Sequence, residues 1–185
     1  MTRVGYAAGT TQHPTYHRIG DHAECTQIEF DAQQISYAEV LDRFFEWHNA
    51  FRKPYARQYM SAVLFHNEHQ REAWTEAVAG REDAKRKVQT EAQDFNGFTW
   101  AEDYHQKYYL RRNKTVALEL KGRFPTLEQF VDATATARAN AILGGFLEPE
   151  RGQLEELGFS EESIEELMGR KRSFFGNLFR SVIPG

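Results

Sequence analysis

The chain has 185 residues and a mass of 21.5 kDa, the size of one domain or of one domain with an appendage. Its formal net charge of -4 and isoelectric point near 6.0 argue against a general nucleic-acid binder. Cys25 is its one cysteine, which excludes an internal disulfide and a Cys-x-x-Cys metal site. No apolar run approaches the roughly 20 residues of a membrane span, and no signal-peptide pattern opens the chain. We therefore expect a cytoplasmic protein without a membrane partner or a Cys-x-x-Cys metal site. We also expect it to be a monomer without a metal.

Turn-forming residues punctuate the beginning of the sequence. They are Gly5, Gly9, Pro14 and Gly20. A rigid loop between two regular elements commonly presents binding side chains. This one has Tyr16 near its middle and Glu24 at its end, so we expect chemistry there.

From Glu24 onwards the sequence alternates strand and helix signals. The range 24–30 alternates with period two, with Thr26, Ile28 and Phe30 on one face, which predicts a half-buried strand. Ser36 and Glu39 have the spacing of a capping box and predict the start of a helix.

The alternation continues through the middle of the chain. The range 58–66 predicts a second strand, and Asn67 predicts the cap of a second helix. A third strand is expected over 88–93, a turn over 95–98 and a helix over 101–110. This order predicts an α+β fold with helices packed on a mixed or antiparallel sheet.

The last third of the sequence is helical in character. Helices are expected over 127–144 and after Ser160. The closing segment 170–185 combines aromatic and basic residues, which is typical either of a tail docked on the domain or of an amphipathic helix that binds a surface or a partner.

Three segments, in order, resemble the peptide methionine sulfoxide reductase A family. They read VGYAAGTTQHPTY followed by GDHAE, then ARQYMSAVLFHNEHQ, then AEDYHQKYYLRRNK. The resemblance implies a ferredoxin-like α/β sandwich over residues 1–122, followed by a helical extension over 123–185. The family's nucleophile is a cysteine in a Gly-Cys-Phe-Trp-Gly motif, which this sequence lacks. We expect the strand and helix that carry this motif to lie upstream of Met1.

The resemblance also implies an activity. Members are peptide-methionine (S)-S-oxide reductases, which repair free or protein-bound oxidised methionine under oxidative stress. Their cysteine becomes a sulfenic acid, which a thioredoxin-type thiol reduces again. No cofactor is implied.

The site residues are carried over by matching motifs. Glu24 matches the glutamate that protonates the sulfoxide oxygen, and we expect an aromatic pocket to bury it and keep it protonated near neutrality. Tyr16 and Tyr59 match the tyrosines that hydrogen-bond this oxygen. His22 either orients Glu24 or is an ordinary loop histidine with its own partner.

Two departures from the family pattern stand out. Pro54 replaces an acidic residue that many members place five positions before the second tyrosine, so a supporting hydrogen bond is lost or made by another group. No cysteine follows Cys25, so a resolving thiol must come from outside. We do not expect Cys25 to be the nucleophile, because neighbouring strand residues point to opposite faces and it would turn away from Glu24. His66 and His69 are a candidate metal pair without an evident third ligand.

Two functions remain open. The chain is either part of a methionine-S-sulfoxide reductase, or a non-catalytic relative that binds methionine sulfoxide or a protein partner without turnover. Binding without thiol-dependent reduction would distinguish the second from the first.

Overall fold

The computed structural model describes residues 1–82 and 86–169, which form two compact units. Residues 4–101 form the first, which we call the sheet unit. Residues 1–3 and 102–169 form the second, which we call the helical unit. The segment 170–185, expected as a docked tail or an amphipathic helix, lies outside the described residues.

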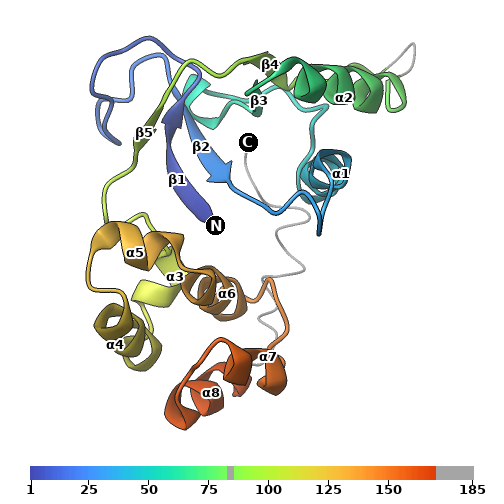
Figure 1. Cartoon of the computed structure of the whole chain (residues 1–185). Helices are drawn as coiled ribbons and strands as arrows, with labels where there is room; N and C mark the ends of the chain where they lie inside the picture. Colours follow the sequence, from blue (N-terminus) through green and yellow to red (C-terminus); the bar gives the residue numbers. More distant parts are fainter. Residues whose placement is uncertain (83–85, 170–185) are drawn as a thin grey trace. The chain divides into compact units, whose positions relative to one another are not determined.

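Two small sheets organise the strands (Figure 1). The first has the order β2-β1-β5, and the second pairs β3 with β4. Their bounds are β1 Thr2–Ala7, β2 Ala23–Ile28, β3 Ala62–Phe65, β4 Glu91–Asp94 and β5 Phe98–Trp100. β1 and β5 are antiparallel, with Tyr6 opposite Thr99, and β3 and β4 are parallel, with Val63 opposite Ala92. The sequence did not indicate β1, because a turn-forming glycine interrupts its pattern. It did not indicate β5, because a strand of three residues is too short to show a pattern.

The half-buried strand expected over 24–30 is present as β2. Ala23 is fully buried and Cys25 is half-buried, whereas Thr26 is exposed and Ile28 is 49% exposed. The face that carries Cys25 is therefore the more buried one.

Both helix starts predicted in the sheet unit are confirmed. α1 (Tyr37–Trp47) begins with a capping box in which Ser36 Oγ accepts a hydrogen bond from the Glu39 backbone N–H at 3.2 Å. α2 (Glu68–Ala79) begins at Asn67, whose Oδ1 accepts from the Gln70 backbone N–H at 3.0 Å. These caps satisfy backbone donors that the first helical turn leaves unpaired.

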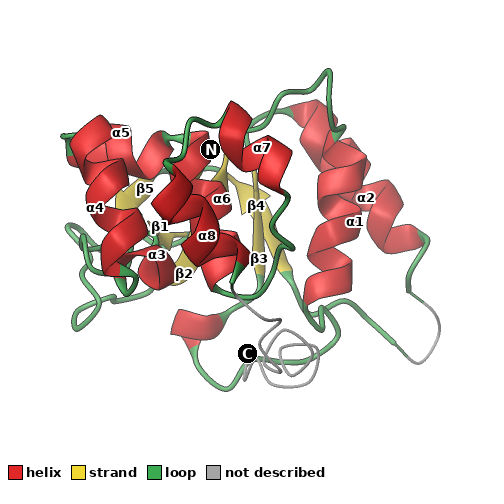
Figure 2. Ribbon diagram, turned by 90° about the horizontal axis from the view of Figure 1, so that it is seen from below, coloured by secondary structure: helices red, strands yellow, loops and turns green. Residues whose placement is uncertain are grey.

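The core of the sheet unit joins both helices to β3. Leu41, Val63, Phe65 and Trp74 are buried together, and Phe45 stacks on Trp74 with ring centroids 5.3 Å apart. Figure 2 shows α1 and α2 side by side next to β3. Burial of this apolar surface is what anchors the parallel β3–β4 pair, which is too small to be stable alone.

The strand predicted over 58–66 forms only in its second half. Residues Arg57–Tyr59 form a 3-10 turn, η1, and β3 begins at Ala62. Consequently Tyr59 lies on a turn and not on a strand.

The helical unit contains six short helices. They are α3 Tyr108–Arg111, α4 Lys114–Arg123, α5 Leu127–Asp132, α6 Thr134–Leu143, α7 Arg151–Glu156 and α8 Glu161–Met168. The helix predicted over 101–110 was wrong, since turns precede α3 and Lys107 adopts a left-handed conformation with φ of 52°. The helix predicted over 127–144 is interrupted at Ala133, whose backbone is extended. The Ser160 cap is confirmed.

Residues 1–3 belong to the helical unit through polar contacts. Arg3 pairs with Asp132 at 2.6 Å. Lys107 Nζ donates to the backbone oxygen of Thr2 at 2.7 Å and to its hydroxyl at 2.8 Å. Burial lowers the pKa of Lys107 to about 8, because the charged ammonium loses most of its water.

The mixed α/β class is therefore confirmed. The division at residue 122 between a reductase domain and a helical extension stays a prediction.

Candidate functional site

The loop between β1 and β2 is fastened by Asp21. Its carboxylate accepts hydrogen bonds from the backbone N–H groups of Thr10 and Thr11, at 2.8 and 2.9 Å, and from both of their hydroxyls. These donors, those of Thr11 first, hold the pKa of Asp21 well below its ordinary value. Gly20 has a φ of +63°, and a Cβ there would lie 2.0 Å from the Thr11 hydroxyl oxygen. The loop therefore needs glycine at this position.

Arg57 ties η1 to the same loop. Its Nε donates to the backbone oxygen of Asp21 at 2.8 Å, and its Nη2 donates to that of Ala8 at 2.7 Å. Nη1 forms an ion pair with Glu91 of β4. The guanidinium thus fixes the turn that carries Gln58 and Tyr59 against the loop that carries Tyr16, and a rigid fork of donors suits such a multiple contact.

The two tyrosines and the glutamate that the sequence singled out lie in one neighbourhood of the sheet unit. A hydrogen bond with Tyr55 is the largest cause of a raised pKa of Tyr59, and the nearby Tyr16 and Glu24 raise it further. The rings of Tyr55 and Tyr59 are 5.1 Å apart. Tyr55 is the neighbour of Pro54, so a hydroxyl one residue later supports Tyr59 where the acidic side chain is missing.

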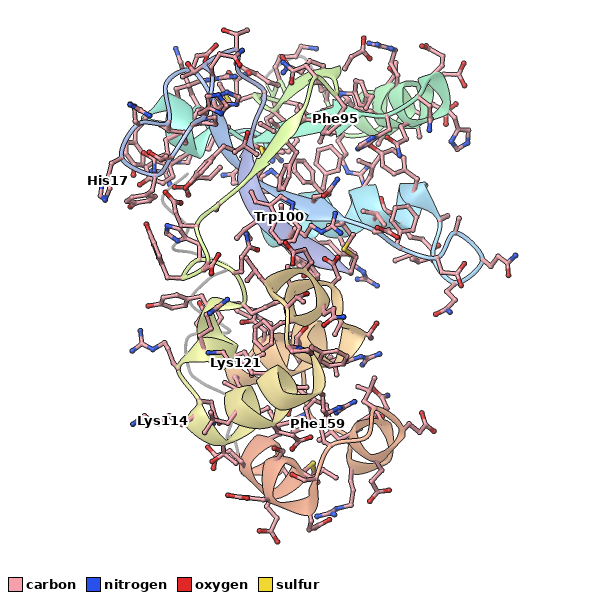
Figure 3. The ribbon with its side chains drawn as sticks, turned by 60° about the vertical axis from the view of Figure 1, so that its left-hand side comes forward. His17, Phe95, Trp100, Lys114, Lys121 and Phe159 are labelled. Carbon is pink, nitrogen blue, oxygen red and sulfur yellow. The ribbon has the colours of Figure 1, made fainter. Side chains whose placement is uncertain are left out.

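Glu24 is held by η1 but is not buried. Gln58 Nε2 donates to Glu24 Oε1 at 2.6 Å. Glu24 is exposed, so the expectation that an aromatic pocket buries it was wrong for this chain. Tyr16 is also exposed, at 37%, and its ring packs edge-on against His17, which Figure 3 shows at the outer end of the loop.

His22 serves the loop. Its ring is buried, and its Nε2 lies 2.9 Å from the backbone oxygen of Thr11. Because a carbonyl oxygen only accepts, Nε2 carries a hydrogen, and Nδ1 has no hydrogen-bond partner among the described residues. The contact favours the loop-histidine interpretation over a role in orienting Glu24.

Cys25 is poorly suited to be a nucleophile. Burial is the main reason why its pKa is raised to about 11, so very little thiolate exists near neutrality. Along β2, Glu24 is exposed while Cys25 turns into the unit, as the strand alternation predicted.

The histidine pair shows no sign of a metal centre. The ring of His66 stacks on Phe95 with centroids 4.3 Å apart, and both His66 and His69 are exposed. Within residues 1–82 and 86–169, no group of three or more His, Cys, Asp or Glu side chains is placed to hold a metal ion.

A model of the family described as peptide methionine sulfoxide reductase matches residues 1–137. This chain belongs to that family. It is 35% identical over 163 residues to a peptide methionine sulfoxide reductase from Drosophila melanogaster, a match that covers 86% of this chain and 65% of the relative. It is 42% identical over 119 residues to peptide methionine sulfoxide reductase MsrA from Saccharolobus solfataricus, covering 58% of this chain and 66% of the relative.

One solved structure has a similar fold. The crystal structure of Mxr1 from Saccharomyces cerevisiae in reduced form matches with a TM-score of 0.54 and 25% identity, covering 62% of this chain and 71% of that one. The chain spans about two thirds of the length of the curated relatives it matches.

The sequence did not point to four residues that hold the candidate site together, namely Arg57, Gln58, Tyr55 and Asp21. Gln58 lay inside a quoted segment, and its position one residue before Tyr59 was the available signal. Nothing in the sequence indicated the partners of Arg57, because two of them are backbone oxygens in a distant loop.

No helix within the described parts of the chain is long and apolar enough to cross a membrane.

Proposed function

We propose that this chain supplies the oxygen-binding and proton-donating side of a peptide-methionine (S)-S-oxide reductase. The observation that carries the proposal is the gathering of Tyr16, Glu24 and Tyr59 in one neighbourhood. Glu24 is the proton donor, and the tyrosine hydroxyls donate hydrogen bonds to the sulfoxide oxygen. Membership of the family and the names of the relatives support this assignment.

The chemistry requires such a set of donors. A thiolate attacks the sulfoxide sulfur, and the sulfur–oxygen bond breaks only if the departing oxygen is protonated, since oxide is a very poor leaving group. The oxygen passes to the attacking sulfur, which is oxidised to a sulfenic acid while the methionine sulfur is reduced by the same two electrons. Two further thiols, of thioredoxin type, then yield the free thiol, a disulfide and water.

The attacking thiolate is not assigned to Cys25, whose pKa of about 11 and half-buried side chain argue against it. The same observation favours the second candidate, a chain that binds methionine sulfoxide without reducing it. The substrate is oxidised methionine, free or in proteins, and no metal or prosthetic group takes part. The monomeric state and cytoplasmic location expected from the sequence belong to this proposal.

Binding and turnover of N-acetyl-L-methionine sulfoxide methylamide test the two candidates. Calorimetric titration of the full chain should give a tighter dissociation constant for the S-sulfoxide than for the R-sulfoxide or the thioether. Glu24→Met, which removes the donor, should lower that preference about fivefold, the usual value of one hydrogen bond. Equal affinities for sulfoxide and thioether would refute both candidates.

Turnover then separates the candidates. Incubation with dithiothreitol and chromatography of the products measures reduction directly. Reduction by dithiothreitol that the wild-type chain accelerates and Glu24→Met does not would support the reductase candidate, in which this chain donates the proton and the thiolate comes from outside. Binding without accelerated reduction would support the non-catalytic candidate for these 185 residues.

A further inference from the structure

Gln58 is the hydrogen-bond partner of Glu24 among the described residues, and its chemistry restricts what Glu24 can do. The amide Nε2 lies 2.6 Å from Glu24 Oε1. An amide nitrogen carries two hydrogens and has no lone pair to offer, so the oxygen that faces it must be an acceptor. In a carboxylate both oxygens qualify, but in a carboxylic acid only the carbonyl oxygen does.

This asymmetry decides where the proton of Glu24 resides. With the amide oriented as in the structure, Nε2 towards Glu24, Oε1 of a protonated Glu24 must stay the carbonyl oxygen to keep its hydrogen bond from Gln58. The hydroxyl hydrogen is then confined to Oε2. An exposed carboxyl without such a partner distributes its proton equally between its two oxygens, so the contact doubles the population of one proton position and fixes its orientation.

Gln58 is itself held firmly enough to impose this geometry. It lies in η1 between Arg57, which is tied to Asp21, Ala8 and Glu91, and Tyr59, which hydrogen-bonds with Tyr55. The Gln58 side chain is half-buried, whereas the Glu24 side chain is exposed. The more buried residue therefore positions the more exposed one, as precise proton transfer requires.

We propose that Gln58 is a positioning residue that assigns the transferable proton of Glu24 to Oε2 and aims it at the sulfoxide oxygen bound by Tyr16 and Tyr59. The inference rests on the proposed function of Glu24 as proton donor. It predicts that Gln58 matters for sulfoxides and not for thioethers, which have no oxygen to protonate.

A spectroscopic measurement tests the contact without any substrate. The side-chain amide signals of Gln58, identified by their loss in Gln58→Met, should shift in Glu24→Met, because the hydrogen bond to Glu24 Oε1 is then lost. Gln33→Met should leave these signals unchanged. Amide signals that stay in place in Glu24→Met, or that shift equally in Gln33→Met, would overturn the inference whatever the chain binds.

Binding tests the positioning role. Gln58→Met has nearly the same volume but no donor, and it should weaken affinity for N-acetyl-L-methionine-S-sulfoxide methylamide about fivefold while leaving affinity for the thioether unchanged. Gln33→Met is the matched control, because Gln33 is exposed on a loop and its side chain is outside the site. The control should bind both compounds as the wild type does.

The outcomes distinguish the positioning role of Gln58 from the proposed function of the chain, on which that role rests. If Glu24→Met loses sulfoxide preference but Gln58→Met keeps it, the role of Gln58 is refuted while the proposed function stands. If Gln58→Met weakens sulfoxide and thioether binding equally, Gln58 is structural and the positioning role is refuted. If the wild type shows no preference for sulfoxide, the proposed function is refuted and the positioning role with it.

Discussion

Cys25 should react slowly with an aromatic disulfide reagent, although it is the one cysteine of the chain. Burial raises its pKa from 9.0 to about 11. At pH 8 this lowers the thiolate population about a hundredfold, but each thiolate becomes about tenfold more nucleophilic as its basicity rises. The two effects leave a rate about tenfold below that of an unperturbed thiol. Its half-buried position slows attack further.

The matched control is the same cysteine in the unfolded chain. The rate of disulfide exchange is followed by absorbance from pH 7 to 10, with the folded chain in buffer and the unfolded chain in urea, and Cys25→Ser provides the blank. The unfolded chain should react faster at pH 8, and the folded rate should still be rising at pH 10. A folded rate equal to the unfolded one, or one that levels off below pH 9, would refute this reasoning and restore Cys25 as a candidate nucleophile.

Three further predictions concern stability, each measured by urea denaturation followed by circular dichroism. Burial lowers the pKa of Lys107 from 10.5 to about 8, so the unfolded state binds more protons than the folded state between these pH values. The free energy of unfolding of the wild type should therefore rise with pH in this range, by up to about 3 kcal/mol relative to Lys107→Met. Parallel stability curves for the two proteins would contradict this. Burial also lowers the pKa of His48, so on acidification the unfolded state takes up a proton before the folded state does. The free energy of unfolding should therefore fall as pH drops below about 6.5, and His48→Gln should make it less dependent on pH. An unchanged slope in the variant would show that His48 does not cause the pH dependence. Trp74→Ala should lower the free energy of unfolding by about 3–5 kcal/mol, because it leaves a cavity in the core. Trp47→Ala is the control, since its side chain is 70% exposed, and it should change stability by less than about 0.5 kcal/mol. Similar losses in both variants would contradict the placement of Trp74 in the core.

The prediction for His48 has a specific structural basis. Its Nδ1 donates to the backbone oxygen of Phe44, and its Nε2 lies 2.7 Å from the Ser61 hydroxyl, which in turn lies 2.9 Å from that of Thr90. Nδ1 must carry the hydrogen because a carbonyl only accepts, so the neutral ring accepts from Ser61 through Nε2. These hydrogen bonds join the end of α1 to the residues next to β3 and β4. Protonation of Nε2 would make it a donor, so that Ser61 would have to accept from His48 instead of donating to it.

The local signals in the sequence predicted local structure well. Ser36 and Asn67 were identified as helix caps because the bonds they make span only three residues, and both caps are present. The motifs around Tyr16, Glu24 and Tyr59 identified the family, since family membership is encoded in short runs of residues. The roles of these three residues stay predictions.

The sequence failed where a contact between distant segments overrides a local preference. The pattern before Ala62 favoured a strand, but Arg57 and Gln58 make contacts with residues 8–24 that a 3-10 turn permits. The sequence also did not decide which face of β2 is buried, because burial there depends on what packs against Cys25 and not on the hydrophobicity of Ile28.

The sequence by itself thus determined the caps, the α/β class and the family, because each is written in residues close together along the chain. Only the tertiary structure decided that Glu24 is exposed, that Gln58 holds it and that Tyr55 supports Tyr59. These contacts depend on where the loop after β1 meets η1, some 34 residues later for the Glu24–Gln58 pair. Their geometry follows from packing and from the backbone bonds of Arg57, which no pattern of neighbouring residues specifies.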